Sequence, residues 1–193
     1  MSSPDIQPSL YRIIWPGELH LIEEHLIRLA PEDRKMRFCG TLNAEAIHLY
    51  CAGIDWSRTT VTGCFIDGQL RGIADLVLMP ATYKYEAELA ITVEKPFQDQ
   101  GIGTALLGKS LDLARNRFIT TAHLYCLSDN VKMRHIAKKF EATFNLDGPD
   151  VDGTLSPPWP TYRSLIEEAA LNSQAIWSAT FNTTSNLKPA IAP

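Results

Sequence analysis

Residues 93 to 107 read V-E-K-P-F-Q-D-Q-G-I-G-T-A-L-L and carry the clearest structural signal in the chain. The run before them, 85–93, alternates in polarity and predicts a β-strand, whereas the apolar residues of 101–118 recur at helical spacing. Glycines therefore stand where a strand ends and a helix begins. The first N–H groups of a helix have no intrahelical acceptor, and the helix dipole makes that end positive. The stretch therefore predicts an anion-binding loop.

Two glycines of this loop, Gly101 and Gly103, lack a Cβ and would let an anion approach the backbone closely. Other phosphate motifs do not fit. A Walker loop ends in Gly-Lys-Ser/Thr, which is absent. A Rossmann loop needs a third glycine where this chain has Leu106. A Rossmann loop also follows the first strand of a parallel unit, whereas this loop follows the third strand of an antiparallel group.

The rest of the chain predicts one mixed α/β domain over 10–155 with helices on both faces of its sheet. It is preceded by a disordered tail, 1–9, and followed by a C-terminal helix and flexible tail over 156–193. Asp67-Gly68 between two β-rich runs predicts a hairpin. The expected strands are 10–15, 59–66, 70–79, 85–93, 123–127 and 142–146, and the expected helices are 16–29, 32–38, 44–51, 101–118, one after 128–130, and 162–177.

Composition fits a globular domain of 193 residues, with 45% hydrophobic and 21% charged residues. A net charge of −4 gives no general attraction to nucleic acid or to anionic membranes. The four cysteines lack metal-ligand spacing, so we expect reduced thiols and no metal. No apolar run is long enough to span a bilayer, and residues 1–8 do not read as a secretion signal, so we expect a cytoplasmic protein.

The loop is similar to the acetyl-CoA motif of the GNAT superfamily of N-acetyltransferases, Q/R-x-x-G-x-G/A, with Gln98, Gly101 and Gly103 in its fixed places. The order of elements over about 10–155 also resembles the GNAT fold, a mixed and mostly antiparallel sheet whose fourth and fifth strands splay apart. The resemblance implies acetyl-CoA as co-substrate. It implies as cofactor-binding residues Ile91, Val93, Gln98, Asp99, Gln100, Gly101, Gly103, Thr104, Asn130 and Met133.

Two further segments, 28–38 and 128–140, resemble the branch that includes bacterial protein-lysine acetyltransferases. This resemblance implies an amine acceptor, which is either a protein lysine or a small molecule. The helix over 162–177 can pack on its own domain or on a second copy, so a monomer and a homodimer both stay open.

Acetyl transfer to an amine needs the neutral amine, which a general base can provide. Glu88 on the predicted strand 85–93 is the candidate base, and Glu86 on the same face is its competitor. Many GNAT enzymes carry a tyrosine that acts as the general acid seven residues after the asparagine that matches Asn130, but this chain has Ala137 there. A non-catalytic acyl-CoA sensor is therefore the alternative to an enzyme.

Overall fold

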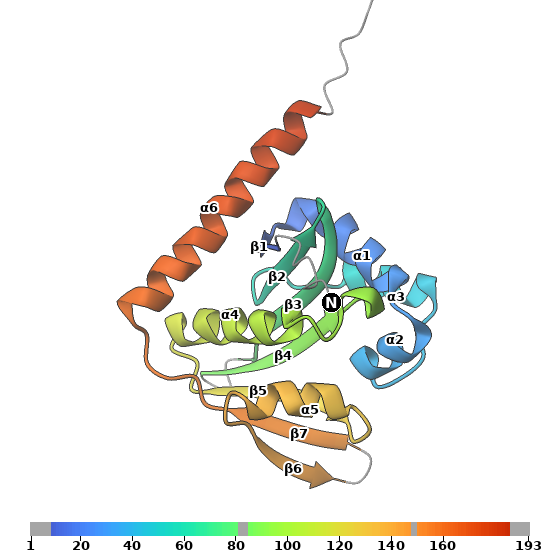
Figure 1. Ribbon diagram of the computed structural model, residues 1–193, viewed down its shortest axis with the longest axis vertical. Helices are drawn as coiled ribbons and strands as arrows, with labels where there is room; N and C mark the ends of the chain where they lie inside the picture. Colours follow the sequence, from blue (N-terminus) through green and yellow to red (C-terminus); the bar gives the residue numbers. More distant parts are fainter. Residues whose placement is uncertain (1–8, 81–84, 148–149, 186–193) are drawn as a thin grey trace, which may run out of the picture.

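A single seven-stranded sheet runs through the computed structural model, which describes residues 9–80, 85–147 and 150–185 (Figure 1). The strand order is β1-β2-β3-β4-β5-β7-β6. Only β4 and β5 pair in parallel, and the other neighbours are antiparallel, as the predicted mixed sheet requires. The strands are β1 (Leu10–Ile14), β2 (Thr59–Ile66), β3 (Gln69–Leu78), β4 (Glu86–Val93), β5 (Thr121–Leu127), β6 (Thr143–Asp147) and β7 (Asp150–Leu155).

Helices cover both faces of the sheet, which confirms the predicted layers (Figure 1). On one face lie α1 (Leu19–Arg28), α2 (Pro31–Phe38) and α3 (Ala44–Ala52), after the 3-10 turn η1 (Pro16–Glu18). On the other lie α4 (Ile102–Asn116) and α5 (Val131–Lys138), while α6 (Tyr162–Ser185) packs on α4 and β1. No helix in the described ranges combines the length and hydropathy that a membrane crossing requires.

The helix α4 is buried on more than one side, because its apolar residues form two stripes rather than one. Leu106, Leu107 and Leu113 are each at most 1% exposed, in the core that the sheet forms with α4, α5 and α6. A second core lies between the sheet and α1 and α3. Packing on both sides fixes the position of the N-terminus of α4 relative to the end of β4.

The strand β7 was not expected, because its Asp152-Gly153 pair reads as a second turn. In the structure β7 inserts between β5 and β6, with Val151 and Leu155 fully buried. A Cβ on Gly153 would lie 3.0 Å from the ring of Phe144, so the glycine makes room for a neighbouring side chain rather than for a turn.

The C-terminal helix is also longer than predicted. We expected it to end at Trp177 and the chain to be disordered from Thr180, but α6 continues to Ser185. Between Tyr162 and Ser185 there is neither glycine nor proline, so nothing local stops the helix. Residues 1–8 and 186–193 of the expected tails lie outside the described residues.

Candidate active site between β4 and β5

The two parallel strands at the centre of the sheet separate after a short contact. β4 and β5 pair only through Glu86 with Thr121, Ala87 with Ala122, and Glu88 with His123. Beyond Glu88 the strand β4 keeps its partner β3 as far as Val93, but on its other side it pairs with no strand in the part of the chain that the structure describes. This confirms the predicted splay of the fourth and fifth strands.

The backbone N–H and C=O groups of β4 point alternately toward β3 and toward β5. Glu86 O accepts a hydrogen bond from Met79 N at 3.0 Å, and Glu94 N donates to Arg71 O at 2.9 Å. Since an antiparallel ladder bonds every second residue in this way, the even-numbered residues of β4 bond to β3. The N–H and C=O groups of Leu89, Ile91 and Val93 therefore face the gap, where they can pair with an extended ligand.

The loop after β4 presents a helix N-terminus to the same gap. A 3-10 turn, η2 (Lys95–Phe97), leads to Asp99 and Gly101, which both have left-handed backbone with φ of 62° and 82°. Gly101 is the N-cap of α4, and the first helical bond runs from Ala105 N to Gly101 O. The N–H groups of residues 102–104 thus have no intrahelical acceptor and suit an anion.

Glycine is required at positions 101 and 103 for different structural reasons. A Cβ on Gly101 would meet nothing within 4 Å, so its positive φ is what favours glycine. A Cβ on Gly103 would lie 2.9 Å from Ile136 Cδ1 on α5. Gly103 therefore allows α5 to pack closely on the start of α4, whereas the sequence had suggested only that it leaves room for an anion.

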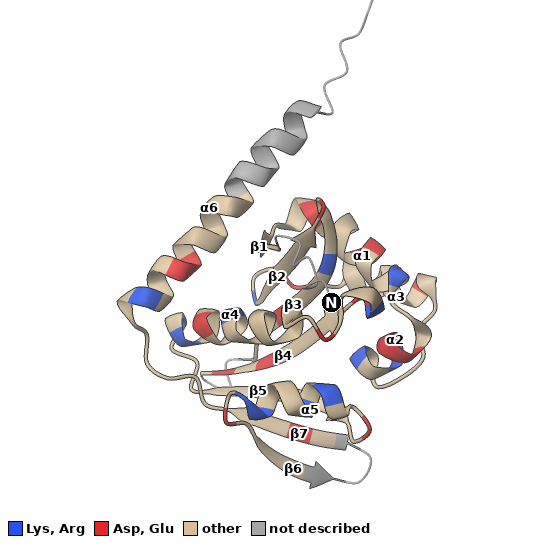
Figure 2. Ribbon diagram, in the orientation of Figure 1, with Lys and Arg blue, Asp and Glu red and all other residues tan. Residues whose placement is uncertain are grey.

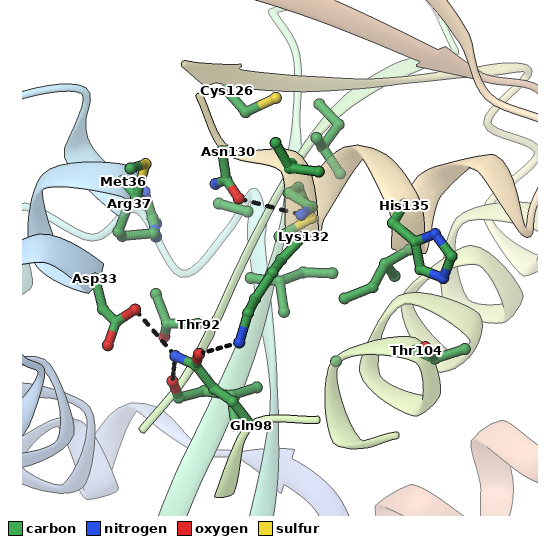
Figure 3. A pocket seen from close by; sticks show the side chains of 18 of the residues that line it. Asp33, Met36, Arg37, Thr92, Gln98, Thr104, Cys126, Asn130, Lys132 and His135 are labelled. Atoms are coloured by element: carbon green, nitrogen blue, oxygen red, sulfur yellow. Dashed lines mark hydrogen bonds between the residues drawn. The ribbon is translucent and has the colours of Figure 1, made fainter. Parts of the chain in front are cut away.

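A cavity of about 550 Å³, the β4–β5 cavity, joins these features (Figure 3). All of the predicted cofactor-binding residues except Gln100 line it. The candidate base Glu88 does not line it. The predicted residues that line it are Ile91, Val93, Gln98, Asp99, Gly101, Gly103, Thr104, Asn130 and Met133. The cavity is also lined by side chains from α2, β5, α5 and the C-terminal end of α5 that were not among the predicted site residues: Asp33, Met36, Arg37, Tyr125, Cys126, Lys132, His135 and Lys139.

A chain of polar contacts crosses the cavity from α2 to α5 (Figure 3). Gln98 Nε2 donates to Asp33 Oδ1 and to Val93 O, both at 3.0 Å. Gln98 Oε1 accepts from Lys132 Nζ at 3.1 Å, and the same ammonium donates to Asp99 Oδ2 at 2.7 Å. Gln98 therefore fixes the start of the loop through its side chain.

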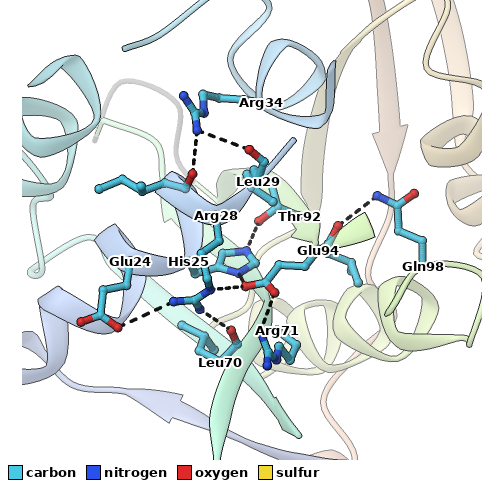
Figure 4. A network of polar contacts seen from close by, with 12 residues as sticks. Glu24, His25, Arg28, Leu29, Arg34, Leu70, Arg71, Thr92, Glu94 and Gln98 are labelled. Atoms are coloured by element: carbon cyan, nitrogen blue, oxygen red, sulfur yellow. Dashed lines mark hydrogen bonds and ion pairs between the residues drawn. The ribbon is translucent and has the colours of Figure 1, made fainter. Parts of the chain in front are cut away.

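A buried network anchors the junction of β4 with this loop (Figure 4). Glu94 Oε1 accepts from Arg28 Nε at 2.8 Å and lies 3.2 Å from His25 Nδ1, while Oε2 accepts from Arg71 Nη1 at 2.8 Å. His25 Nε2 lies 2.9 Å from Thr92 Oγ1. Burial alone would raise the pKa of Glu94, but hydrogen bonds from His25, Arg28 and Arg71 outweigh it and lower the pKa to about 2.

A second buried ion pair holds α2 against the sheet beside the cavity. Arg37 Nη2 donates to Asp75 Oδ2 at 2.6 Å and to Tyr50 Oη at 2.8 Å. Burial is the main cause that raises the pKa of Tyr50 to about 12, and the carboxylate of Asp75 adds to it. The phenol therefore stays protonated and neutral at physiological pH.

The two candidate bases, Glu86 and Glu88, lie on the short stretch of β4 that pairs with β5. Glu86 Oε2 is 3.1 Å from His123 Nε2, so its carboxylate already has a partner. Glu88 is exposed, and its carboxylate has no hydrogen bond or ion pair with another residue in the described part of the chain. Its neighbour Leu89 lines the cavity.

Asn130 and Ala137 occupy the two ends of α5. The side chain of Asn130 caps the helix by accepting from Met133 N at 3.1 Å, and the residue also lines the cavity. Ala137 is fully buried and provides no proton donor. Of the tyrosines in the described ranges, Tyr125 lines the cavity.

Comparison with known proteins agrees with this geometry. The sequence profile of the acetyltransferase (GNAT) family matches residues 52–141, from the end of α3 through α5, and so covers the β4–β5 junction and the 98–104 loop. Among curated proteins none matches the chain.

Several solved structures share the fold. The GNAT domain of S. lividans PAT has a TM-score of 0.66 at 18% identity, over 81% of this chain and 99% of that one. The ribosomal-protein-S18-alanine N-acetyltransferase from Escherichia coli has 0.62 at 15%, over 80% and 97%. The PaiA N-acetyltransferase from Thermoplasma acidophilum, solved in complex with coenzyme A, has 0.57 at 18%, over 77% and 99%.

The splayed strands and the loop both lie within the segment that the profile matches. Residues 52–141 match the acetyltransferase (GNAT) family, and the chain shares its fold with solved GNAT proteins.

Proposed function

We propose that the chain transfers an acetyl group from acetyl-CoA to an amine. The observation that carries this proposal is that the unpaired edge of β4 and the N-terminus of α4 open into one cavity. The free N–H groups of 102–104 suit the diphosphate, and the backbone groups of Ile91 and Val93 suit the amide-containing arm. Acetyl-CoA would supply the activated thioester, and the PaiA protein, which shares the fold, was solved with coenzyme A.

Within this proposal, Glu88 is the general base. A lysine amine has a pKa near 10.4, so only about one in 10³ is neutral at pH 7. The carboxylate of Glu88, which has no partner among the described residues, belongs to the last residue pair with β5 and lies one residue before the part of β4 that lines the cavity from Leu89 onward. It would take the proton directly or through one water. Glu86 is less suited, because its carboxylate is bonded to His123.

The acceptor is an amine, and a protein lysine is favoured over a small molecule. The segments that resemble protein-lysine acetyltransferases, 28–38 and 128–140, include α2 and α5, which both contribute to the cavity lining. This resemblance is the argument for a lysine acceptor. A panel of acceptors that contains both lysine peptides and small amines tests it.

The second candidate function is a non-catalytic acyl-CoA sensor. The buried Ala137 favours it, because no phenol stands there to protonate a leaving thiolate. In the sensor, acetyl-CoA would bind without turnover of any acceptor.

One experiment tests the base. Glu88→Gln should keep acetyl-CoA binding and lose about 10²-fold or more in turnover near pH 7, with a smaller loss at pH 9–10, where more amine is already neutral. Glu86→Gln is the matched control and should lose less. If Glu88→Gln keeps full activity across this pH range, another residue must be the general base. Binding by the unmodified protein without turnover of any acceptor would favour the sensor.

A further inference from the structure

A basic stripe lines one wall of the β4–β5 cavity in a protein whose net charge is −4. Lys132, His135 and Lys139 all line the cavity from α5 and its C-terminal end. They are three and four residues apart, so they lie on one face of the helix. Figure 2 shows the blue basic residues of α5 beside the gap between β4 and β5. A wall of this charge favours an anion in the cavity.

The first residue of the stripe reaches the 98–104 loop. Lys132 Nζ is 2.7 Å from Asp99 Oδ2 and 3.1 Å from Gln98 Oε1. The carboxylate of Asp99 is 76% exposed and the Lys132 side chain 55% exposed, so the pair is accessible and weak. An incoming phosphate group can therefore take the ammonium from Asp99 at little cost.

The stripe also runs alongside the start of α4. Gly103 and Ile136 are in close contact, which places α5 next to the free N–H groups of residues 102–104. Lys132 and Lys139 are seven residues apart, which is about 10 Å along a helix. A diphosphate held at the N-terminus of α4 is shorter than this distance. The stripe is therefore long enough to contact a further phosphate group.

We propose that Lys132 and Lys139 bind the 3′-phosphate of acetyl-CoA, with His135 between them, and so select the 3′-phosphorylated form of the co-substrate. This inference rests on the proposed function, because it assigns a further contact to the ligand proposed for the cavity. The diphosphate is held by backbone N–H groups, and the 3′-phosphate by side chains of α5. Charge-assisted hydrogen bonds of this kind are the strong ones in phosphate recognition.

The test is the affinity for acetyl-CoA and for 3′-dephospho-acetyl-CoA, measured by calorimetry on the full chain without acceptor. The unmodified protein should bind acetyl-CoA about tenfold or more tightly. Lys132→Met and Lys139→Met should each reduce this preference, and the double variant should bind the two ligands nearly alike. Methionine keeps much of the aliphatic stem and removes the charge.

Lys138→Met is the matched control. Lys138 is exposed on the same helix, next to Lys139, but does not line the cavity. Its variant removes one positive charge and should keep the full preference. The inference is overturned if the unmodified protein binds both ligands equally, if the double variant keeps the preference, or if Lys138→Met loses as much as Lys139→Met. Failure of the unmodified protein to bind either ligand would instead overturn the proposed function, and this inference with it.

Discussion

Replacing Glu94 with glutamine should destabilise the protein and leave a specific mark on its pH dependence. The Glu94 side chain is 6% exposed and accepts hydrogen bonds from Arg28 and Arg71, whose side chains are 36% and 21% exposed. Its pKa is lowered from the ordinary 4.5 to about 2. Each pKa unit corresponds to about 1.4 kcal/mol, and solvent screening of the arginines reduces the total.

We therefore expect the charge of Glu94 to contribute roughly 2 kcal/mol to the free energy of unfolding at neutral pH. In Glu94→Gln the amide NH2 group also faces the N–H donors of Arg28 and Arg71 and cannot accept from them. We therefore expect the free energy of unfolding to fall by about 2–3 kcal/mol. For a chain of this length that corresponds to a fall in Tm of roughly 5–10 °C. Urea denaturation at pH 7 measures the free energy directly.

The pH dependence has a defined sign. Because the folded-state pKa is lowered, the stabilisation is fully present above the unfolded-state pKa near 4.5 and is lost as the pH falls toward about 2. The difference between Glu94→Gln and the unmodified protein should be constant from about pH 6 to 8 and should shrink below about pH 4.5.

Glu24→Gln provides the control. Glu24 is 62% exposed and lies 3.7 Å from the same Arg28, so its removal should cost less than about 0.5 kcal/mol. The account of the network would be refuted if Glu94→Gln were as mild as this control at pH 7. A difference that stays unchanged down to pH 3 would refute the assigned pKa shift.

Two further predictions concern the loop glycines. Gly101→Ala should cost about 1 kcal/mol of stability, because its φ of 82° strains any residue with a Cβ, and should weaken the Tm shift caused by acetyl-CoA. Gly103→Val should cost about 1–3 kcal/mol, because the new side chain meets Ile136 and pushes α5 away, and should abolish that shift. Thermal denaturation with and without ligand checks both, and unchanged shifts would show that the loop does not hold the ligand.

The local features of the site could be predicted from the sequence. Alternation in 85–93, two glycines and a helical period after them predicted β4, the loop and α4, because each signal lies within a few consecutive residues. The splay of β4 from β5 followed from the family resemblance, and the structure confirms it.

The side chains that come from distant segments could not be predicted. Glu94 meets His25 and Arg28 across 69 and 66 residues of sequence. The sequence alone gives no signal for this pairing. Lys132 lies outside the apolar stripe of its helix, and only the packing of α5 on α4 shows that its face borders the cavity.

The strand β7 was missed for a similar reason. Gly153 has the local signature of a turn, and its actual role depends on the ring of Phe144, which lies on the neighbouring strand. Tertiary contacts of this kind override local propensity.

The central claim is that the 98–104 loop and the edge of β4 bind acetyl-CoA, and calorimetric titration of the unmodified protein with acetyl-CoA tests it most directly. The account predicts saturable binding with one site per chain, and no comparable binding of ATP or NAD. Binding should also raise Tm by mass action. Absence of both heat and a Tm shift at millimolar acetyl-CoA would contradict the account.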